Sequence, residues 1–370
     1  MLTAFPKVRG ALQRLQLVQD ILTIMRSKAQ QGGLSFWRQA GEMFWLKLRR
    51  QQTYRFYLMA RMWRPDMPWQ DKLDHFNHAD FSALIDHLNP PAARQRYRHK
   101  PEQKQILLQH GIATPPWFGY FHPQHGRCAN GKPLTTAAEL TALLDGLVDR
   151  QITLKRVVGS GGQGFLSFLV RRDGDAIALE HPLTRARISM ADLLRMLQQE
   201  QTGYLIEHYL VQHPALARLN PDSVNTLRIW ATREAGQLRV VGSFLRVGRR
   251  HVLVDNTAAG GLICTVDEQN GRLLELSSGD LWRKVYPQHP DTGINVTGLS
   301  VPFFHEAEAL ACQALACFPD MAIAGLDIAI TEQGPSVIEI NLDNPAQIGS
   351  ACFDKPGRRL FPTFFAARNG

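Results

Sequence analysis

The sequence predicts a mixed α/β fold of more than one lobe, with a basic helical region in front of it. The chain has 370 residues, which exceeds the usual size of a single hydrophobic core. Hydrophobic residues make up 44% and charged residues 20% of the chain, as is typical of a folded globular protein. Strand-like and helix-like patterns alternate from about residue 91 onward, and this alternation indicates the α/β class.

The N-terminal region carries almost all of the net charge. Residues 1–64 contain twelve Lys or Arg residues against two acidic ones, a local balance of +10 in a chain whose total is +9. Residues 11–26 place apolar side chains at helical spacing, and a second helical run extends from Ser35, a suitable N-cap, to about Arg61. We therefore expect residues 1–90 to form a basic, aromatic-rich helical region.

Three interpretations of this basic region are open. Its helices can pack on the rest of the protein, with arginine stems covering apolar surface. They can instead attach to an anionic membrane surface, where cationic side chains flank interfacial Trp and Phe, or bind a protein partner. No RNP motif, zinc finger or recognition-helix pattern occurs, so nucleic acid is not an expected partner.

The sequence offers no membrane span and no signal peptide. No stretch of eighteen uncharged apolar residues occurs, and Lys7, Arg9 and Arg14 interrupt what would be the apolar part of a signal peptide. Five widely spaced cysteines do not suggest a disulfide framework. We expect a cytoplasmic protein, with peripheral attachment to the inner membrane surface as an open possibility.

The breaker Asn89-Pro90-Pro91 marks the first expected domain boundary. Strand hairpins dominate the second half of the chain, and the expected division is therefore 1–90, 91–210 and 211–370. The expected helices lie near 101–110, 189–200 and 302–317, and the expected strands near 152–158, 165–170, 204–207, 225–233, 237–247, 262–267, 324–331 and 336–340.

A glycine-rich element follows the strand that begins near residue 152. The sequence ITLKRVVGSGGQGF fits neither a Walker A loop nor a GxGxxG turn that opens a helix, and a second strand-like run follows it. Glycines let successive backbone N–H groups approach phosphate oxygens closely. A strand-loop-strand lid over a bound nucleotide fits this pattern, with Lys155 able to neutralise a phosphate. A plain turn is the alternative.

An acidic hairpin lies near the C-terminus, in AGLDIAITEQGPSVIEINLDNP. Asp327 lies on its first strand, and Glu339 and Asn341 share one face of the second strand by period-2 alternation. Charged groups on such apolar strands are costly unless they are paired or bound to a metal. Carboxylate and amide oxygens suit Mg²⁺ that bridges nucleotide phosphates. A polar hairpin facing solvent is the alternative.

A third element, YLIEHYLVQHPALARLNPDSVNTLRIWAT, begins as a strand at 204–207 and continues into a polar segment. Such a hinge can bind adenine through backbone groups, with Glu207 and its neighbours near the purine or ribose. Asn225 and Arg228 follow on a strand-like run. Strict alternation does not allow these two side chains to share one strand face.

These three elements, in this order, resemble the ATP-grasp superfamily, and specifically its sugar-transfer-associated branch. The motifs that carry the resemblance are IEHYLVQHPALARLNPDSVNTLRI, the VDNTAAGGL run and LDIAITEQGPSVIEIN, and the likeness covers roughly residues 90–350. It implies an ATP-grasp fold, in which two α+β lobes clasp ATP with Mg²⁺.

The resemblance also implies a role for individual residues. His99 stands where many relatives have Asp, which leaves Lys104 as a competitor of Lys100 for the first nucleotide lysine. The implied nucleotide ligands are Lys100 and Lys155, the lid glycines Gly161, Gly162 and Gly164, and the adenine hinge Glu207, His208, Tyr209 and Leu210. The implied magnesium ligands are Asp327, Glu339 and Asn341, and Arg228 and Arg246 resemble the cations that face the transferred γ-phosphate.

Charge considerations suggest the reaction. Attack of a carboxylate on a γ-phosphate brings two anions together, so cations are needed around the transferred group. Gly260 and Gly261 can lend N–H groups to an oxyanion, although a simple tight turn explains them equally well. We expect an ADP-forming carboxylate–amine ligase with an acyl-phosphate intermediate. The alternatives are an ATP-grasp phosphotransferase and a non-catalytic nucleotide-binding scaffold at a membrane surface.

Overall fold

The computed structural model describes residues 6–159, 162–353 and 355–369. The chain forms two compact units. The first contains the N-terminal region up to residue 84 together with residues 278–284 and the segment from 346 onward, and the second contains residues 85–277 and 285–345. The sequence analysis assigned the two later segments to the C-terminal part of the chain.

The first unit is built from helices around one apolar core. Three of them, α1, α2 and α3, bury Ile24, Leu46 and Leu58 against one another, and α12 adds Ala351 to the same core. The unit comprises α1 (Pro6–Gln30), α2 (Phe36–Arg50), α3 (Tyr54–Met59), α4 (Trp69–Asp74), most of α5 (His78–Leu88), α12 (Ile348–Cys352), the 3₁₀ helix η2 (Gly357–Leu360) and α13 (Pro362–Asn369).

The predicted second helix is two helices. Ser35 caps α2 as expected, because its hydroxyl accepts a hydrogen bond from the Arg38 N–H. The helix then ends where Gln51 adopts a left-handed conformation with φ of 51°. The hydroxyl of Thr53 caps α3 by accepting from the Phe56 N–H, so the chain restarts in a new direction. Glutamine is not a typical helix terminator, and the sequence pattern therefore gave no sign of this break.

The first of two sheets in the second unit has the strand order β2-β1-β7-β3-β4-β5-β6, with all neighbours antiparallel. Leu140 and Leu144 of α8 and Leu193 and Leu197 of α9 bury against it. The elements are α6 (Pro91–Arg96), α7 (Lys100–Gln109), β1 (Trp117–Phe121), β2 (Arg127–Cys128), α8 (Ala137–Asp145), β3 (Gln151–Arg156), β4 (Leu166–Asp173), β5 (Ala176–Glu180), β6 (Arg187–Ser189), α9 (Met190–Gln198) and β7 (Tyr204–His208).

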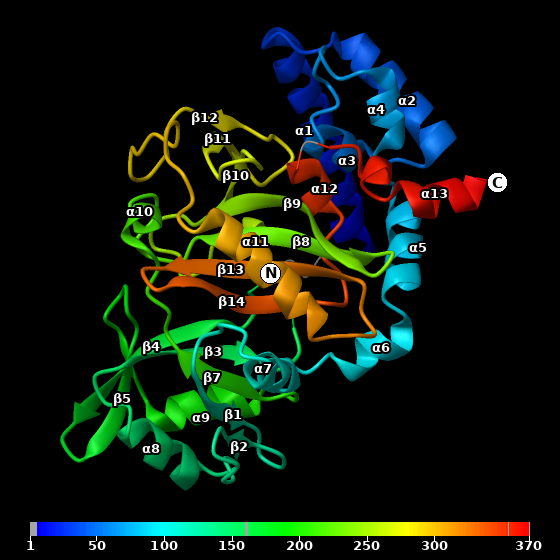
Figure 1. Cartoon of the computed structure of the whole chain (residues 1–370). Coiled ribbons are helices and arrows are strands. Elements are labelled where there is room, and N and C mark those ends of the chain that lie inside the picture. The colour runs from blue at the N-terminus through cyan, green and yellow to red at the C-terminus, as the bar shows by residue number, and fades with distance from the viewer. Residues whose placement is uncertain (1–5, 160–161, 354, 370) are drawn as a thin grey trace. The chain divides into compact units, whose positions relative to one another are not determined.

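The second sheet has the order β12-β11-β10-β9-β8-β13-β14, and α11 lies across β8, β13 and β14 (Figure 1). Every other residue of β13 and β8 contributes to a continuous apolar core with α11, including Ile229, Leu326 and Leu315. The elements are α10 (Pro214–Ala217), β8 (Thr226–Glu234), β9 (Gln237–Val247), the 3₁₀ helix η1 (Thr257–Ala259), β10 (Leu262–Val266), β11 (Leu273–Ser278), β12 (Val285–Tyr286), α11 (Phe304–Ala316), β13 (Ile323–Thr331) and β14 (Gly334–Asn341).

Asn89, which the sequence analysis treated as part of a helix breaker, is a fully buried clamp. Its Nδ2 donates to the carbonyls of Ile323 and Leu342, both at 2.7 Å, and its Oδ1 accepts from the N–H groups of Ala322 and Ile323. These bonds join the chain after α5 to the start of β13. Within the described part of the chain, no helix is long and apolar enough to cross a bilayer.

Candidate functional site

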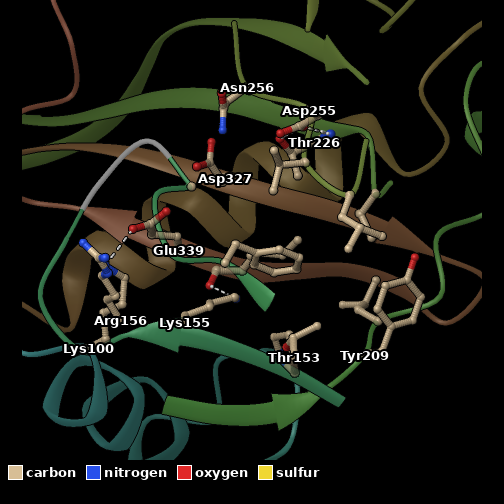
Figure 2. Close-up of a pocket in the computed structure, with 18 of the residues that line it drawn as sticks. Lys100, Thr153, Lys155, Arg156, Tyr209, Thr226, Asp255, Asn256, Asp327 and Glu339 are labelled. Atoms are coloured by element: carbon tan, nitrogen blue, oxygen red, sulfur yellow. Dashed lines mark hydrogen bonds and ion pairs between the residues drawn. The ribbon is translucent and has the colours of Figure 1, made fainter. Parts of the chain in front are cut away.

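An open cavity lies in the second unit between residues of both sheets. Figure 2 shows polar side chains from β3, β8, β13 and β14 converging on it. Its apolar walls include Pro115, Phe165, Leu210, Val254 and Ile338. Of the predicted site residues, the cavity lining includes Lys100, Lys155, Gly162, His208, Tyr209, Leu210, Arg246, Asp327 and Glu339.

The predicted glycine hairpin is present between β3 and β4. Gly162 and Gly164 have φ of +69° and +70°, a region that favours glycine. A Cβ atom on Gly164 would lie 2.4 Å from Arg156 Nε, and one on Gly162 would lie 2.5 Å from Asn256 Nδ2. The positive φ favours glycine at both positions, and a larger residue would also displace the ends of the Arg156 and Asn256 side chains. Gly161, the third predicted lid glycine, lies outside the described residues.

Glu207 lies on β7 of the first sheet and does not line the cavity. Its side chain is 1% exposed and lies between two lysines: Lys104 of α7 contacts Oε1, and Lys155 Nζ of β3 lies 2.7 Å from Oε2. Lys104, itself 4% exposed, also donates to Thr114 Oγ1 at 2.8 Å. Lys155, by contrast, reaches the cavity. The sequence analysis placed Glu207 near the purine or ribose of a bound nucleotide; in the structure its carboxylate pairs with Lys155, which lines the cavity.

The two lysines determine the charge state of Glu207. Burial alone would raise the pKa of this carboxyl, but the positive charges of Lys155 and Lys104 outweigh burial and bring the pKa below its ordinary value. Burial lowers the pKa of Lys104, against the attraction of Glu207. Glu207 is therefore ionised, as a buried carboxylate must be to hold two ammonium groups.

The three residues after Glu207 form a backbone edge of the cavity. The N–H groups of His208 and Tyr209 donate to the carbonyls of Pro116 at 2.9 Å and Gln151 at 3.1 Å. Leu210 lines the cavity, and in the described part of the chain its N–H donates to no acceptor. The segment therefore presents one free donor beside apolar side chains, which is a suitable edge for a planar ring.

Lys100, at the start of α7, lines the cavity, whereas Lys104 does not. Lys100 Nζ donates to the Gly159 carbonyl at 2.6 Å and lies 3.2 Å from Glu339 Oε1. Its side chain is thus shared between the glycine hairpin and the second sheet. The two lysines that the sequence analysis left as competitors have different surroundings, one at the cavity wall and one buried behind it.

Asp327 is the corresponding buried carboxylate of the second sheet. Arg228, its cross-strand partner on β8, binds it with two hydrogen bonds of 2.6 and 3.0 Å, and Arg246 Nη1 adds a third at 3.0 Å. Burial would raise the pKa of Asp327, but the two guanidinium groups keep it below its ordinary value. Of the two arginines predicted to face a phosphate, Arg246 lines the cavity and Arg228 supports Asp327 behind it.

Glu339 lies directly opposite Asp327 across the β13–β14 hairpin, at a bulge where the register shifts after Asp327. Both carboxylates line the cavity. Asn341, two residues further along β14, pairs with Gly325 and does not belong to the cavity lining. Among the residues that the structure describes, its buried Nδ2 atom has no hydrogen-bond partner, and its role as a magnesium ligand stays a prediction. Within the described ranges no group of three or more His, Cys, Asp or Glu side chains gathers, so a cation in the cavity would depend on the carboxylates of Asp327 and Glu339.

Thr226, Asp255 and Asn256 are among the cavity residues that the sequence analysis missed. Asp255 Oδ2 accepts from the N–H and the hydroxyl of Thr226, at 2.9 and 2.5 Å, and its Oδ1 lies 2.7 Å from Arg246 Nη2. Burial outweighs the arginine and raises the pKa of Asp255. Asn256 follows it in the cavity wall (Figure 2). The signal was an acidic residue within the apolar run VLVDN, in a motif to which no role was assigned.

Gly260 and Gly261 lie in the tight turn that was the alternative explanation for them. Gly260 has φ of +86°, and its N–H donates to the Thr257 carbonyl at 3.1 Å. The Gly261 N–H donates to the Asn256 carbonyl at 3.0 Å. A Cβ atom on Gly261 would lie 2.1 Å from the Asp255 carbonyl oxygen, so this glycine lets the turn close behind the cavity wall. Their role toward an oxyanion stays a prediction.

A glycine hairpin and an acidic strand pair on two facing antiparallel sheets define the class of nucleotide-grasping α+β proteins. The sequence matches the model of the sugar-transfer associated ATP-grasp family over residues 81–352, and the chain belongs to that family. A search of curated protein sequences gives no match.

Several solved structures are similar to this chain at low identity. A D-cycloserine synthetase matches with a TM-score of 0.44 and 12% identity, over 85% of this chain and 93% of that one. Biotin carboxylase from Campylobacter jejuni gives 0.43 and 13%, over 74% and 48%. N5-carboxyaminoimidazole synthase from Aspergillus clavatus gives 0.38 and 12%, over 74% and 55%. The chain spans about half the length of the first solved structures it matches.

The different surroundings of Lys100 and Lys104 give a first prediction. We expect Lys104→Met to lower the free energy of unfolding by about 3 kcal/mol, because it leaves Glu207 buried with one cation fewer. Lys100→Met should change it by less than about 1 kcal/mol and instead weaken nucleotide binding. Urea unfolding and calorimetric titration with ATP measure the two effects. The same loss of stability in both variants would contradict this assignment.

The lowered pKa of Glu207 gives a second prediction, for acid stability. A carboxyl whose folded-state pKa lies below its unfolded value stabilises the fold above the unfolded value, near 4.5, and loses this contribution as pH falls through the folded value. The stability difference between wild type and Glu207→Gln should therefore be constant above about pH 5.5 and shrink below about pH 4.5. Urea unfolding across this range measures it. A difference that grows on acidification would exclude an ionised Glu207.

Proposed function

We propose that the protein is an ATP- and magnesium-dependent ligase that phosphorylates a carboxylate and passes the acyl group to an amine. Family membership supports ATP as the nucleotide. One observation carries the proposal: the cations Lys100, Lys155 and Arg246 and the carboxylates Asp327 and Glu339 line one cavity. Phosphoryl transfer requires both kinds of group, cations for the transferred phosphate and oxygen ligands for a metal on the leaving phosphates.

The purine is expected at the hinge. Leu210 offers a free N–H at the edge of the cavity, beside the apolar side chains of Pro115 and Ile338. A backbone donor beside apolar side chains suits an aromatic ring that has acceptors on its edge. With the purine there, we expect the phosphates toward the glycine hairpin and the two cavity lysines.

The cavity residues fit a magnesium ion. Asp327 and Glu339 are cross-strand neighbours, and both line the cavity. Hard oxygen donors are the ligands that Mg²⁺ selects. When bound, the ion would neutralise charge on the nucleotide phosphates. Lys100 now lies against Glu339, in a pair whose side chains are 15% and 23% exposed. Because this pair is partly solvated, Lys100 could leave Glu339 to contact a phosphate, and Glu339 could then contact the metal.

The remaining steps rest on residues of the chain. Lys155 and Arg246 each have a buried carboxylate behind them, Glu207 and Asp327, which fixes where their charges point. A carboxylate substrate and a γ-phosphate then meet between fixed cations rather than in water, which stabilises the transition state. The glycine hairpin covers the cavity from the first sheet and would shield an acyl phosphate from hydrolysis.

A third prediction tests the metal ligand. Glu339→Gln keeps the size of the side chain but removes its charge, and we expect turnover to fall by roughly 10²- to 10³-fold with the fold intact. The matched control is Glu332→Gln, an exposed residue in the turn of the same hairpin, which should turn over like wild type. Magnesium-dependent ATP turnover is the measurement. Normal turnover in Glu339→Gln would remove the residue from the site.

A fourth prediction tests the reaction class. Transfer of the γ-phosphate gives ADP and phosphate, whereas an adenylating ligase gives AMP and pyrophosphate. Hydroxylamine should intercept an acyl phosphate as a hydroxamate when the correct acid is present, so acids can be screened before the amine is known. ADP with an acid-dependent hydroxamate supports the ligase. ADP with a stable phosphorylated product and no hydroxamate would replace it with a phosphotransferase, and AMP would overturn the assignment of the site.

A further inference from the structure

The outward face of α2, in the first unit, exposes a stripe of large apolar side chains. Trp37, Phe44, Trp45 and Leu48 are 81%, 61%, 47% and 62% exposed. The opposite face of the same helix, with Met43 and Leu46, is buried in the core of the unit, so these four side chains are not needed for packing. Soluble helices normally present polar residues on this face. We name these four residues the α2 stripe.

Cations flank the α2 stripe on both sides. With about 100° of rotation per residue, Trp37, Phe44 and Leu48 lie within a sector about 40° wide, and Trp45 lies beside it. By the same count Arg38 and Arg49 lie along one flank and Lys47 along the other. The guanidinium of Arg49 lies 5.6 Å from the centre of the Trp45 ring, which keeps the charge at the edge of the stripe. The apolar stripe and its cationic flanks together make the outer face of α2 an amphipathic surface.

One of these cations is offset by an acidic residue of α2, because Arg38 Nε lies 3.3 Å from Glu42 Oε1, whereas Lys47 and Arg49 have no acidic partner on the helix. The helix has one acidic residue, Glu42, and it lies on the buried side. There Lys72 Nζ lies 2.7 Å from its Oε2, and the Tyr57 hydroxyl donates to the same oxygen at 2.9 Å. Glu42 is therefore neutralised inside the unit. The outer face of α2 keeps a net positive charge, in a region whose sequence balance over residues 1–64 is +10.

The neighbouring helices extend the same character. Tyr54 of α3 is 45% exposed, and Arg55 beside it is also exposed. On α1, Leu15 and Val18 are exposed, and Arg26 lies 5.7 Å from the ring of Phe36 at the start of α2. Exposed apolar side chains accompanied by arginines thus occur on all three helices. A single exposed Trp would need no explanation, whereas a series of this kind marks a binding surface.

We propose that the α2 stripe binds the surface of an anionic lipid bilayer. A helix that lies in the interface places Trp, Phe and Leu in the acyl boundary and its flanking Arg and Lys at the headgroups. The helix has fifteen residues and is about 22 Å long, enough for a helix lying parallel to the membrane plane. A second copy of the chain is a poorer partner, because the cations on both flanks would face the same cations of the other copy. The inference is independent of the proposed ligase activity.

A fifth prediction follows for the full chain. Sedimentation with vesicles should be strong for phosphatidylcholine containing about 30% phosphatidylglycerol at about 50 mM salt, and fall at least tenfold at about 500 mM salt. Binding to pure phosphatidylcholine vesicles should also be at least tenfold weaker. Equal binding to neutral and acidic vesicles would overturn the proposal, as would no binding to acidic ones.

Two pairs of variants separate this surface from general stickiness or charge. Trp37→Ala with Phe44→Ala should lower binding by about tenfold or more, since the apolar anchor is lost. Lys47→Gln with Arg49→Gln should also lower it by about tenfold or more. The matched controls in the second unit are Val211→Ala with Leu274→Ala, both exposed and apolar, and Arg127→Gln with Lys132→Gln, both exposed and basic. These controls should bind like wild type.

Two results with these variants would overturn the proposal. The first is wild-type vesicle binding by both α2 variants. The second is concentration-dependent dimerisation of the wild type in light scattering that is abolished by the Trp37 and Phe44 changes, without any vesicle binding. That outcome would assign the stripe to a second copy of the chain. Because ATP turnover does not enter either measurement, failure here leaves the ligase proposal untouched, and the reverse also holds.

Discussion

Two buried carboxylates, one in each sheet of the second unit, are the electrostatic foundation of the candidate site. Glu207 lies between Lys104 and Lys155, and Asp327 between Arg228 and Arg246. An isolated buried carboxylate is strongly destabilising, and removing one partner of a buried pair leaves that penalty uncompensated. Each carboxylate therefore requires its cations, and in each set one cation stands behind the carboxylate while the other reaches the cavity.

This arrangement holds the positive charges of Lys155 and Arg246 at fixed positions in the cavity wall. A lysine side chain is flexible, and holding it in one position costs conformational entropy. Glu207 holds Lys155 in position through an ion pair. Asp327 and Asp255 hold Arg246 from two sides in the same way. The charges around the cavity are thus positioned by the folded protein before any substrate arrives. Such preorganisation is the largest contribution to transition-state stabilisation in many enzymes.

The local motifs were predictable from the sequence because each carries its own signal. The glycine hairpin, the β8–β9 and β13–β14 hairpins and α11 all lie within a few residues of their expected ranges. Six strands were missed: β1, β2, β5, β6, β11 and β12. Three of them, β2, β6 and β12, have only two or three residues, which are too few for a periodic pattern. The roles of Lys104 and Asp255 were also missed, since their partners are distant in sequence and appear only once the sheets form.

The same limit applies to the charge of the first unit. The balance of +10 over residues 1–64 does not show which of these cations are buried and which are exposed. Lys72 is buried against Glu42, Lys28 is buried with its ammonium 4.8 Å from the Trp63 ring, and Arg50 pairs with Asp80. These cations serve the interior of the unit. Lys47 and Arg49 are exposed on α2, where Arg49 lies over the Trp45 ring. The burial of the other cations therefore decides where on the first unit the basic surface lies. The packing interpretation and the membrane interpretation of the basic region are therefore compatible, because different residues of the same helices carry them.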